Sequence, residues 1–134
     1  MIALAQKLAR LNDDPSVTRV LILGGTADAV RLAQAASALP EIEVIYSLAG
    51  VTRQPTLPGC RMRSGGFGGT EGFQHYLSEE IIDVVLDATH PFALQINDHA
   101  ATACGALNVP YIRYRRPPWL PQSGDQWQIV ENIV

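Results

Sequence analysis

Cysteine is scarce in this chain, which has only Cys60 and Cys104 among its 134 residues. The two positions form neither a CxxC pair nor a spacing typical of metal ligands. We therefore expect two reduced thiols in or near a core, in a protein of the cytoplasm, and we expect no metal site.

Basic residues and long apolar runs are also lacking. Ten Lys and Arg are outnumbered by 13 Asp and Glu, which gives a net charge of −3 and argues against a general nucleic-acid binder. No stretch reaches the roughly 18 apolar residues that span a membrane, and the amino terminus has no signal-peptide pattern. We expect a soluble protein that is not exported and binds neither nucleic acid nor membranes.

The chain has instead a repeated alternation of apolar strands and helical segments, with enough hydrophobic residues (47%) for one domain. The expected strands are residues 20–23, 42–48, 60–63, 81–89 and 109–114, and the expected helices are 26–39, 70–80 and 93–107, with Pro91 at the start of the last. This order predicts a doubly wound, Rossmann-like α/β fold, with a parallel sheet of about five strands and helices on both faces. We assign residues 19–134 to this domain and 1–18 to a helical extension.

The turn after the first strand, "GGTADA", is the first expected binding segment, because ligands bind at the carboxyl ends of strands in such sheets. A glycine turn that leads into a helix presents backbone N–H groups, so Gly24, Gly25 and Thr26 are expected to hold a phosphate. The full GxGxxG/A fingerprint is not met, because Thr26 stands where the second glycine belongs. An ordinary strand-to-helix turn is the alternative interpretation.

After the second strand, Ser47 occupies the position where NAD-binding proteins carry Asp or Glu, with Arg53 close behind. A carboxylate would repel a 2′-phosphate, whereas a hydroxyl and a guanidinium would hold it. If a dinucleotide binds, these residues predict NADP. A solvated loop cation remains the alternative for Arg53.

The stretch "RSGGFGGTEGF" after the third strand has four glycines in five residues. A flexible linker is disfavoured, since the stretch lies between a strand and a helix of one domain and contains Phe67. We expect the backbone of Gly66, Gly68 and Gly69 to form a wall against a ligand. Phe67 lies either against a planar ring of the ligand or in the core.

Polar residues follow the fourth and fifth strands. Thr89 and His90 end the fourth, where His90 can transfer a proton or contact a ligand, although a structural histidine is the alternative. Asp87 is expected to bind a nearby backbone turn. After the fifth strand, "RYRRPPW" carries Arg113 and Arg116, which suit an anionic small molecule, although solvated loop charges are the alternative.

Five segments together carry a resemblance to a known family: "LILGGTADA", "YSLAGVTRQP", "GGFGGTEGF", "IDVVLDATHPFA" and "VPYIRYRRPPW". In this order and spacing the chain resembles the precorrin-6A reductase family of cobalamin biosynthesis, over about residues 19 to 130. The resemblance implies an enzyme that uses NADPH to reduce a double bond of the tetrapyrrole precorrin-6A or its cobalt-bearing counterpart. The carboxylates of this tetrapyrrole would explain the positive charges of Arg113 and Arg116.

The resemblance also implies two Rossmann-like domains with the nucleotide and the tetrapyrrole between them, of which this chain looks like the first. Thr89 and His90 would then lie on the nicotinamide or substrate side. A second domain or a partner chain is the expected partner, and two copies could pair through the same surface.

The other interpretation of the chain is a non-catalytic nucleotide-binding module that needs a partner chain. A receiver-like signalling domain is disfavoured, because Gly24, Gly25 and Thr26 replace the acidic cluster that such a domain needs for Mg²⁺.

Overall fold

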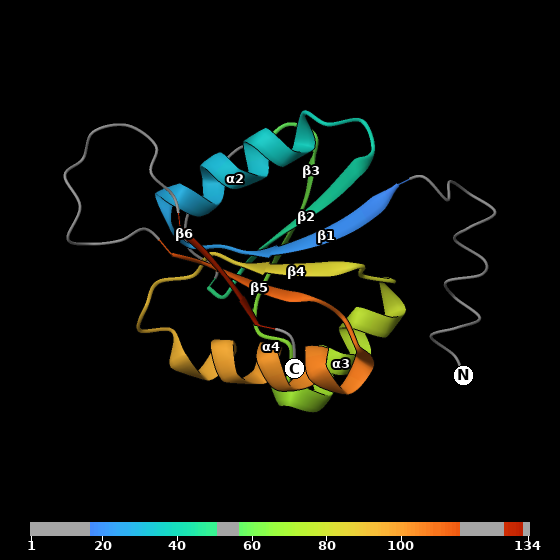
Figure 1. Ribbon diagram of the computed structural model, residues 1–134, viewed down its shortest axis with the longest axis vertical. Helices are drawn as coiled ribbons and strands as arrows, with labels where there is room; N and C mark the ends of the chain where they lie inside the picture. Colours follow the sequence, from blue (N-terminus) through green and yellow to red (C-terminus); the bar gives the residue numbers. More distant parts are fainter. Residues whose placement is uncertain (1–16, 51–56, 116–127, 133–134) are drawn as a thin grey trace.

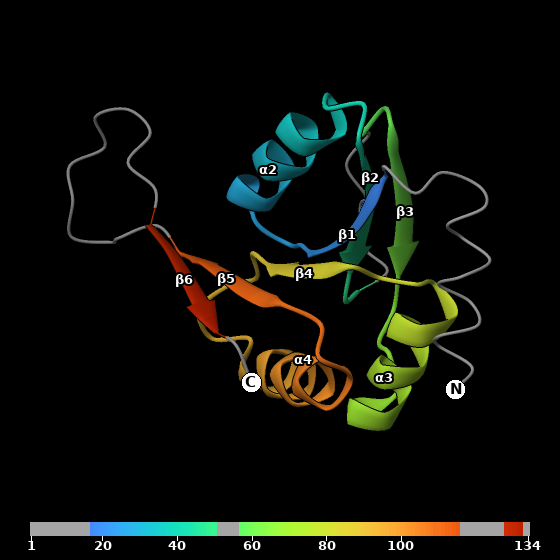
Figure 2. The ribbon, with the colours of Figure 1, turned by 45° about the vertical axis from the view of Figure 1, so that its right-hand side comes forward.

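A sheet with helices on both faces is formed by the residues that the computed structural model describes, 17–50, 57–115 and 128–132. Its elements are β1 (Thr18–Leu23), α2 (Ala27–Ser37), β2 (Ile42–Leu48), β3 (Cys60–Ser64), α3 (Gly69–Glu79), β4 (Val84–Asp87), α4 (Leu94–Leu107), β5 (Tyr111–Arg115) and β6 (Gln128–Asn132). Helix α2 covers one face, and α3 and α4 cover the other (Figure 1). The view in Figure 2 separates these two layers.

The strand order is β3-β2-β1-β4-β5-β6, which is the order found in dinucleotide-binding folds. Strands β1 to β5 pair in parallel, as the sequence predicts, and the Rossmann-like fold is confirmed. A sixth strand, β6, pairs antiparallel with β5 and was not expected from the sequence. From β1 the chain proceeds toward β2, and from β4 toward β5, so the direction reverses between β1 and β4.

Strand β1 is buried on both faces, which explains its continuous apolar run. Leu21 and Leu23 pack in the core beneath α3 and α4. Val20 and Ile22 pack in the second core, beneath α2. The two faces of the sheet therefore have separate hydrophobic layers that meet at the same strand.

Helix boundaries follow local caps. Thr26 is the N-cap of α2, where its hydroxyl accepts a hydrogen bond from the amide of Ala29. Helix α4 begins at Leu94, so the expectation that Pro91 starts this helix is wrong: residues 91 and 92 form a turn. The helix ends at Leu107, as expected, because Asn108 adopts a left-handed conformation (φ 56°).

Three sequence expectations fall outside the described residues: the amino-terminal helix, Arg53 and Arg116. Within the described part of the chain, no helix is long and apolar enough to cross a membrane. The same part holds no cluster of His, Cys, Asp or Glu suited to a metal ion.

Candidate functional site

A row of mostly polar residues crosses the carboxyl edge of the sheet. Strand pairing aligns Ser47 with Leu23 and Arg63, and aligns Asp87 with Leu23 and Arg113. In-register neighbours point to the same face of a sheet, and Leu23 packs under α3 and α4, so the row faces that layer. Residues from five strands are therefore brought together at the edge where α/β proteins bind ligands.

The Gly24–Gly25 turn is held tightly against Tyr46. A Cβ atom at Gly24 would lie 2.3 Å from Cζ of Tyr46, so only glycine fits there. The Gly24 amide donates to the carbonyl of Ser47 at 2.8 Å, and the Gly25 amide donates to the Tyr46 hydroxyl at 3.2 Å. Both glycine amides are thus engaged within the protein, and burial raises the pKa of Tyr46, so its hydroxyl stays protonated.

The amides just after the turn are open. Among the described residues, the N–H groups of Thr26 and Ala27 donate no hydrogen bond, and they lie at the positive end of α2. The hydroxyl of Thr26 is already used, because it donates to the carbonyl of Ala88 at 2.8 Å and accepts from Ala29 at 3.0 Å. An anion at this point would therefore meet backbone donors rather than the threonine side chain.

A cleft of about 130 Å³ opens beside this turn, between the ends of β1, β4 and β5. Its lining includes Thr26, Asp28, Asp87, Thr89 and Arg113. The carboxylate of Asp28 lies 3.3 Å from Arg31, one turn along α2. The cleft thus combines carboxylates, a guanidinium and the open end of a helix.

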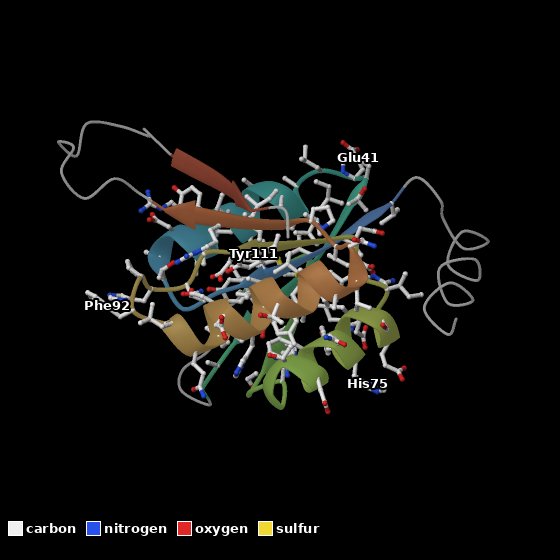
Figure 3. The ribbon with its side chains drawn as sticks, turned by 60° about the horizontal axis from the view of Figure 1, so that its bottom comes forward. Glu41, His75, Phe92 and Tyr111 are labelled. Atoms are coloured by element: carbon white, nitrogen blue, oxygen red, sulfur yellow. The ribbon has the colours of Figure 1, made fainter. Side chains whose placement is uncertain are left out.

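Asp87 is the centre of a buried hydrogen-bond network and is 2% exposed. One carboxylate oxygen accepts from the amide of Thr89 at 3.1 Å and from its hydroxyl at 2.6 Å. The other accepts from Nδ2 of Asn97 and from the hydroxyl of Tyr111. The expectation that Asp87 binds a nearby backbone turn is confirmed by the Thr89 amide. Burial, and then the Asp87 charge, raise the pKa of Tyr111, which lies between the sheet and α4 (Figure 3).

Thr89 presents only an acceptor to a ligand. Its hydroxyl hydrogen is given to Asp87, and its oxygen also accepts from Nδ2 of Asn97 at 2.9 Å. One lone pair is left, so a ligand group bound there must donate a hydrogen bond. Asn97 also contacts Arg113, whose Nη2 lies 3.5 Å from Oδ1, so the same network orients the guanidinium.

His90 lies on an exposed turn after β4. Its Nδ1 accepts from the amide of Phe92 at 3.2 Å, so in the neutral ring the proton is on Nε2. The Phe92 side chain is 82% exposed and extends away from the end of α4 (Figure 3). A proton donor at His90 would have to be the doubly protonated ring, in which Nδ1 no longer accepts from the amide of Phe92.

Arg63, at the end of β3, was not anticipated from the sequence. Its Nη1 donates to Oγ of Ser47 at 2.8 Å and to the carbonyl of Gly65 at 3.1 Å, and its Nη2 donates to the carbonyl of Gly66 at 3.0 Å. The guanidinium carbon lies 3.9 Å from the centre of the Phe67 ring. Burial lowers the pKa of Arg63 from its usual value. Matching the ends of the second and third strands in the sequence would have brought Arg63 next to Ser47.

The glycine loop after β3 combines a structural and an open part. Gly68, the N-cap of α3, has φ 90°, a conformation that other residues adopt with strain. Gly66 has no positive φ, and a Cβ atom at this position would meet no atom within 4 Å, so nothing in the described fold requires glycine there. The ring centre of Phe67 lies 4.4 Å from the ring centre of Phe73, which agrees with the interpretation that Phe67 packs in the core.

A second cavity, of about 40 Å³, lies on the α3 and α4 side of the Gly24 turn. It is lined by residues of the first four loops, among them Gly24, Ser47, Gly66, Phe67 and Thr89. Thr89 thus lines both cavities, which lie on either side of the turn. Two cavities therefore lie at the same edge of the sheet, with Thr89 between them.

Comparison with known proteins identifies one matching family and several similar proteins. The chain matches the family described as Precorrin-6x reductase CbiJ/CobK over residues 19–134. It is 52% identical over 105 residues to Precorrin-6A reductase of Mycobacterium tuberculosis, which covers 78% of this chain and 42% of the relative. Precorrin-6A reductase of Rhodococcus erythropolis is 45% identical over 118 residues, covering 88% of this chain and 48% of that protein.

A solved structure, CobK precorrin-6A reductase, superimposes with a TM-score of 0.71 at 42% sequence identity. The match covers 82% of this chain and 43% of that structure. The chain therefore spans less than half the length of the relatives it matches. Sequence and structure agree that the chain belongs to the precorrin-6A reductase family.

Proposed function

We propose that this chain is the dinucleotide-binding half of a reductase that transfers a hydride from NADPH to a double bond of precorrin-6A, or of its cobalt-bearing counterpart, in cobalamin biosynthesis. Family membership supports the reaction class, because the relatives named above are precorrin-6A reductases. The observation that carries nucleotide binding is the pair of open amides, Thr26 and Ala27, at the point where the strand order reverses.

The cofactor would cross the sheet edge along the two cavities. Its diphosphate would bind the amides of Thr26 and Ala27, while Gly24 and Gly25 shape the turn. Ser47 would face the adenosine ribose, where the missing carboxylate favours a 2′-phosphate. Gly66, Gly68 and Gly69 would form the wall on the adenosine side, and we keep Arg53 as a further candidate there.

The nicotinamide would lie near Thr89. The remaining lone pair of the Thr89 hydroxyl suits the amide N–H₂ of the nicotinamide, which is a donor. Bound NADPH supplies the hydride. The protein's part is to orient the ring, and the Asp87 network does this by fixing the direction of the Thr89 hydroxyl.

The substrate would approach from the side of β5. Arg113 lines the larger cleft and, with Arg116, would pair with carboxylates of the tetrapyrrole. His90, which is exposed after β4, would contact the substrate or, in its doubly protonated form, complete proton transfer. A second domain would close over this side, since the relatives are more than twice as long as the matched segment.

Calorimetric titration of this chain with NADPH and NADH tests the cofactor assignment. We expect NADPH to bind at least about 10-fold more tightly, because one charge-assisted contact to the 2′-phosphate is worth about 1.5–3 kcal/mol. Equal affinity would contradict the 2′-phosphate argument, and binding of neither nucleotide would contradict the dinucleotide site itself.

A non-catalytic nucleotide-binding module is the second candidate, favoured by the fraction of the relatives' length that this chain spans. This module would bind NADPH yet reduce no substrate until a partner domain is added. An assay of NADPH oxidation with precorrin-6A, with and without the second domain as a separate chain, distinguishes the two. Turnover by this chain alone would rule out the module.

A further inference from the structure

Arg63 has the features of an anion-binding residue whose anion is not part of this chain. It lies at the end of β3, directly beside Ser47 at the end of β2. Among the described residues no carboxylate forms an ion pair with it, whereas Arg19 and Arg61 each pair with a glutamate. Its partners within the chain are a hydroxyl and two carbonyls, which are neutral.

The hydrogen bonds of Arg63 leave one edge of its guanidinium open. Arginine has five N–H donors in a fixed planar arrangement. The two on Nη1 go to Ser47 and Gly65, and one on Nη2 goes to Gly66. Among the described residues, no group accepts from Nε–H or from the second Nη2–H, which are on adjacent nitrogens. Two such parallel donors fit the oxygens of a phosphate.

The surroundings of Arg63 hold it in place and leave room for a ligand. Phe67 stacks on the guanidinium at 3.9 Å, and the Tyr76 ring lies 5.0 Å from it, so the side chain is fixed before any ligand arrives. Gly66 has no conformational or packing reason to be glycine, and a side chain there would project into open space beside the guanidinium. The absent side chain keeps this space free.

We propose that Arg63, held by Ser47 and the Gly65–Gly66 carbonyls, binds the 2′-phosphate of the dinucleotide and is the residue that determines preference for the phosphorylated cofactor. The inference rests on the proposed function, since it assigns one subsite of the same ligand. It places the phosphate over the smaller cavity, which Ser47 and Gly66 line. The adenosine half of the ligand then lies over the ends of β1, β2 and β3.

The test compares Arg63→Gln with the unchanged chain by calorimetric titration with NADP⁺, NAD⁺, 2′,5′-ADP and 5′-AMP. We expect the variant to bind NADP⁺ and 2′,5′-ADP about 10- to 100-fold more weakly, while affinity for NAD⁺ and 5′-AMP stays unchanged. Arg61→Gln is the matched control: it removes the same charge two residues earlier in the same strand, where Arg61 pairs with Glu80. The control should bind all four ligands as the unchanged chain does.

The outcomes separate this inference from the proposed function. If the unchanged chain prefers NADP⁺ and Arg63→Gln keeps that preference, the Arg63 assignment is overturned while nucleotide binding stands. If Arg63→Gln weakens all four ligands equally, Arg63 only supports the loop, and the assignment is again overturned. If the unchanged chain binds none of them, both proposals fail.

If Arg63→Gln does not fold, Arg63→Lys tests the same assignment, because lysine keeps the positive charge but lacks the two-donor edge. This variant should lose less NADP⁺ affinity than Arg63→Gln and should keep its NAD⁺ affinity. Thermal unfolding without ligand, followed by circular dichroism, shows whether each variant is folded before titration. Full NADP⁺ affinity in folded Arg63→Lys would show that charge alone suffices and would overturn the role of the open edge.

Discussion

Replacing Gly24 with alanine should force a methyl group into the ring of Tyr46. The new Cβ would lie 2.3 Å from Cζ, 2.4 Å from the hydroxyl oxygen and 2.7 Å from Cε1. Carbon atoms in favourable contact are about 3.5–4.0 Å apart, so the overlap exceeds about 1 Å. Tyr46 is fully buried in the core under α2, so its ring can move only if neighbouring core side chains also shift.

The expected cost combines overpacking with a lost hydrogen bond. Overpacking of a well-packed core costs about 1–3 kcal/mol. A displaced Tyr46 also leaves the Gly25 amide without its acceptor, which costs about a further 1 kcal/mol. We expect Gly24→Ala to lower the free energy of unfolding by about 2–4 kcal/mol, a large part of the total for a domain of this size.

Urea unfolding of a double-mutant cycle with Tyr46→Leu measures the overlap itself. Leucine removes the ring atoms that the new methyl group would meet, at its own cost of about 2–4 kcal/mol. The free energy of unfolding of the double variant should therefore exceed the value expected from adding the two single effects by at least about 1 kcal/mol. Gly66→Ala is the matched control, because its Cβ meets no atom within 4 Å. Additive effects, or an unchanged Gly24→Ala, would refute the packing argument.

Three further predictions concern the glycine loop, the thiols and alkaline stability. Gly66→Val should change the free energy of unfolding by less than about 0.5 kcal/mol yet weaken NADP⁺ binding, whereas Gly68→Val, at φ 90°, should destabilise the chain by about 1–2 kcal/mol. Urea unfolding measures the stability of both variants, and calorimetry measures their NADP⁺ binding. A Gly66→Val variant that unfolds would contradict the open space at this position. Burial raises the pKa of Cys104 to about 12, so a thiol reagent should modify it only after unfolding, and fast reaction in the native state would be the contrary result. The folded state holds the Tyr111 proton more tightly than the unfolded chain, in which the tyrosine pKa is near 10.0. The resulting stabilisation is complete below pH 10 and is lost as the pH rises through the folded pKa. The urea midpoint should therefore fall less steeply with pH in Tyr111→Phe than in the unchanged chain, and identical slopes would contradict this.

The sequence alone predicted the fold and the edge where the candidate site lies. The apolar run from Val20 to Leu23, the glycine turn after it and the Thr26 cap are local signals, and they correctly predicted the first strand, turn and helix. Strand β6 was missed because its five residues follow a proline-rich stretch of the sequence. Pro91 was misplaced because proline suits a turn as well as a first helical turn.

The partners of the candidate site could not be predicted in the same way. Tyr46 supports the glycine turn from 21 residues away, and Arg63 reaches Ser47 across 16 residues, so neither contact leaves a local pattern. The interpretation of the Gly24 and Gly25 amides as phosphate donors stays a prediction, although the structure engages both within the protein. Which amides remain open depends on the side chains packed beneath the turn.

What the sequence by itself determined was the order of strands and helices, and hence the parallel sheet, because hydrophobic period and capping act over a few residues. Only the tertiary structure decided which residues meet at the carboxyl edge. Strand register aligns Arg63, Ser47, Asp87 and Arg113 in one row, and a shift of one residue would turn each of them to the opposite face. Register depends on packing between distant segments, so the chemistry of this edge is a property of the folded sheet.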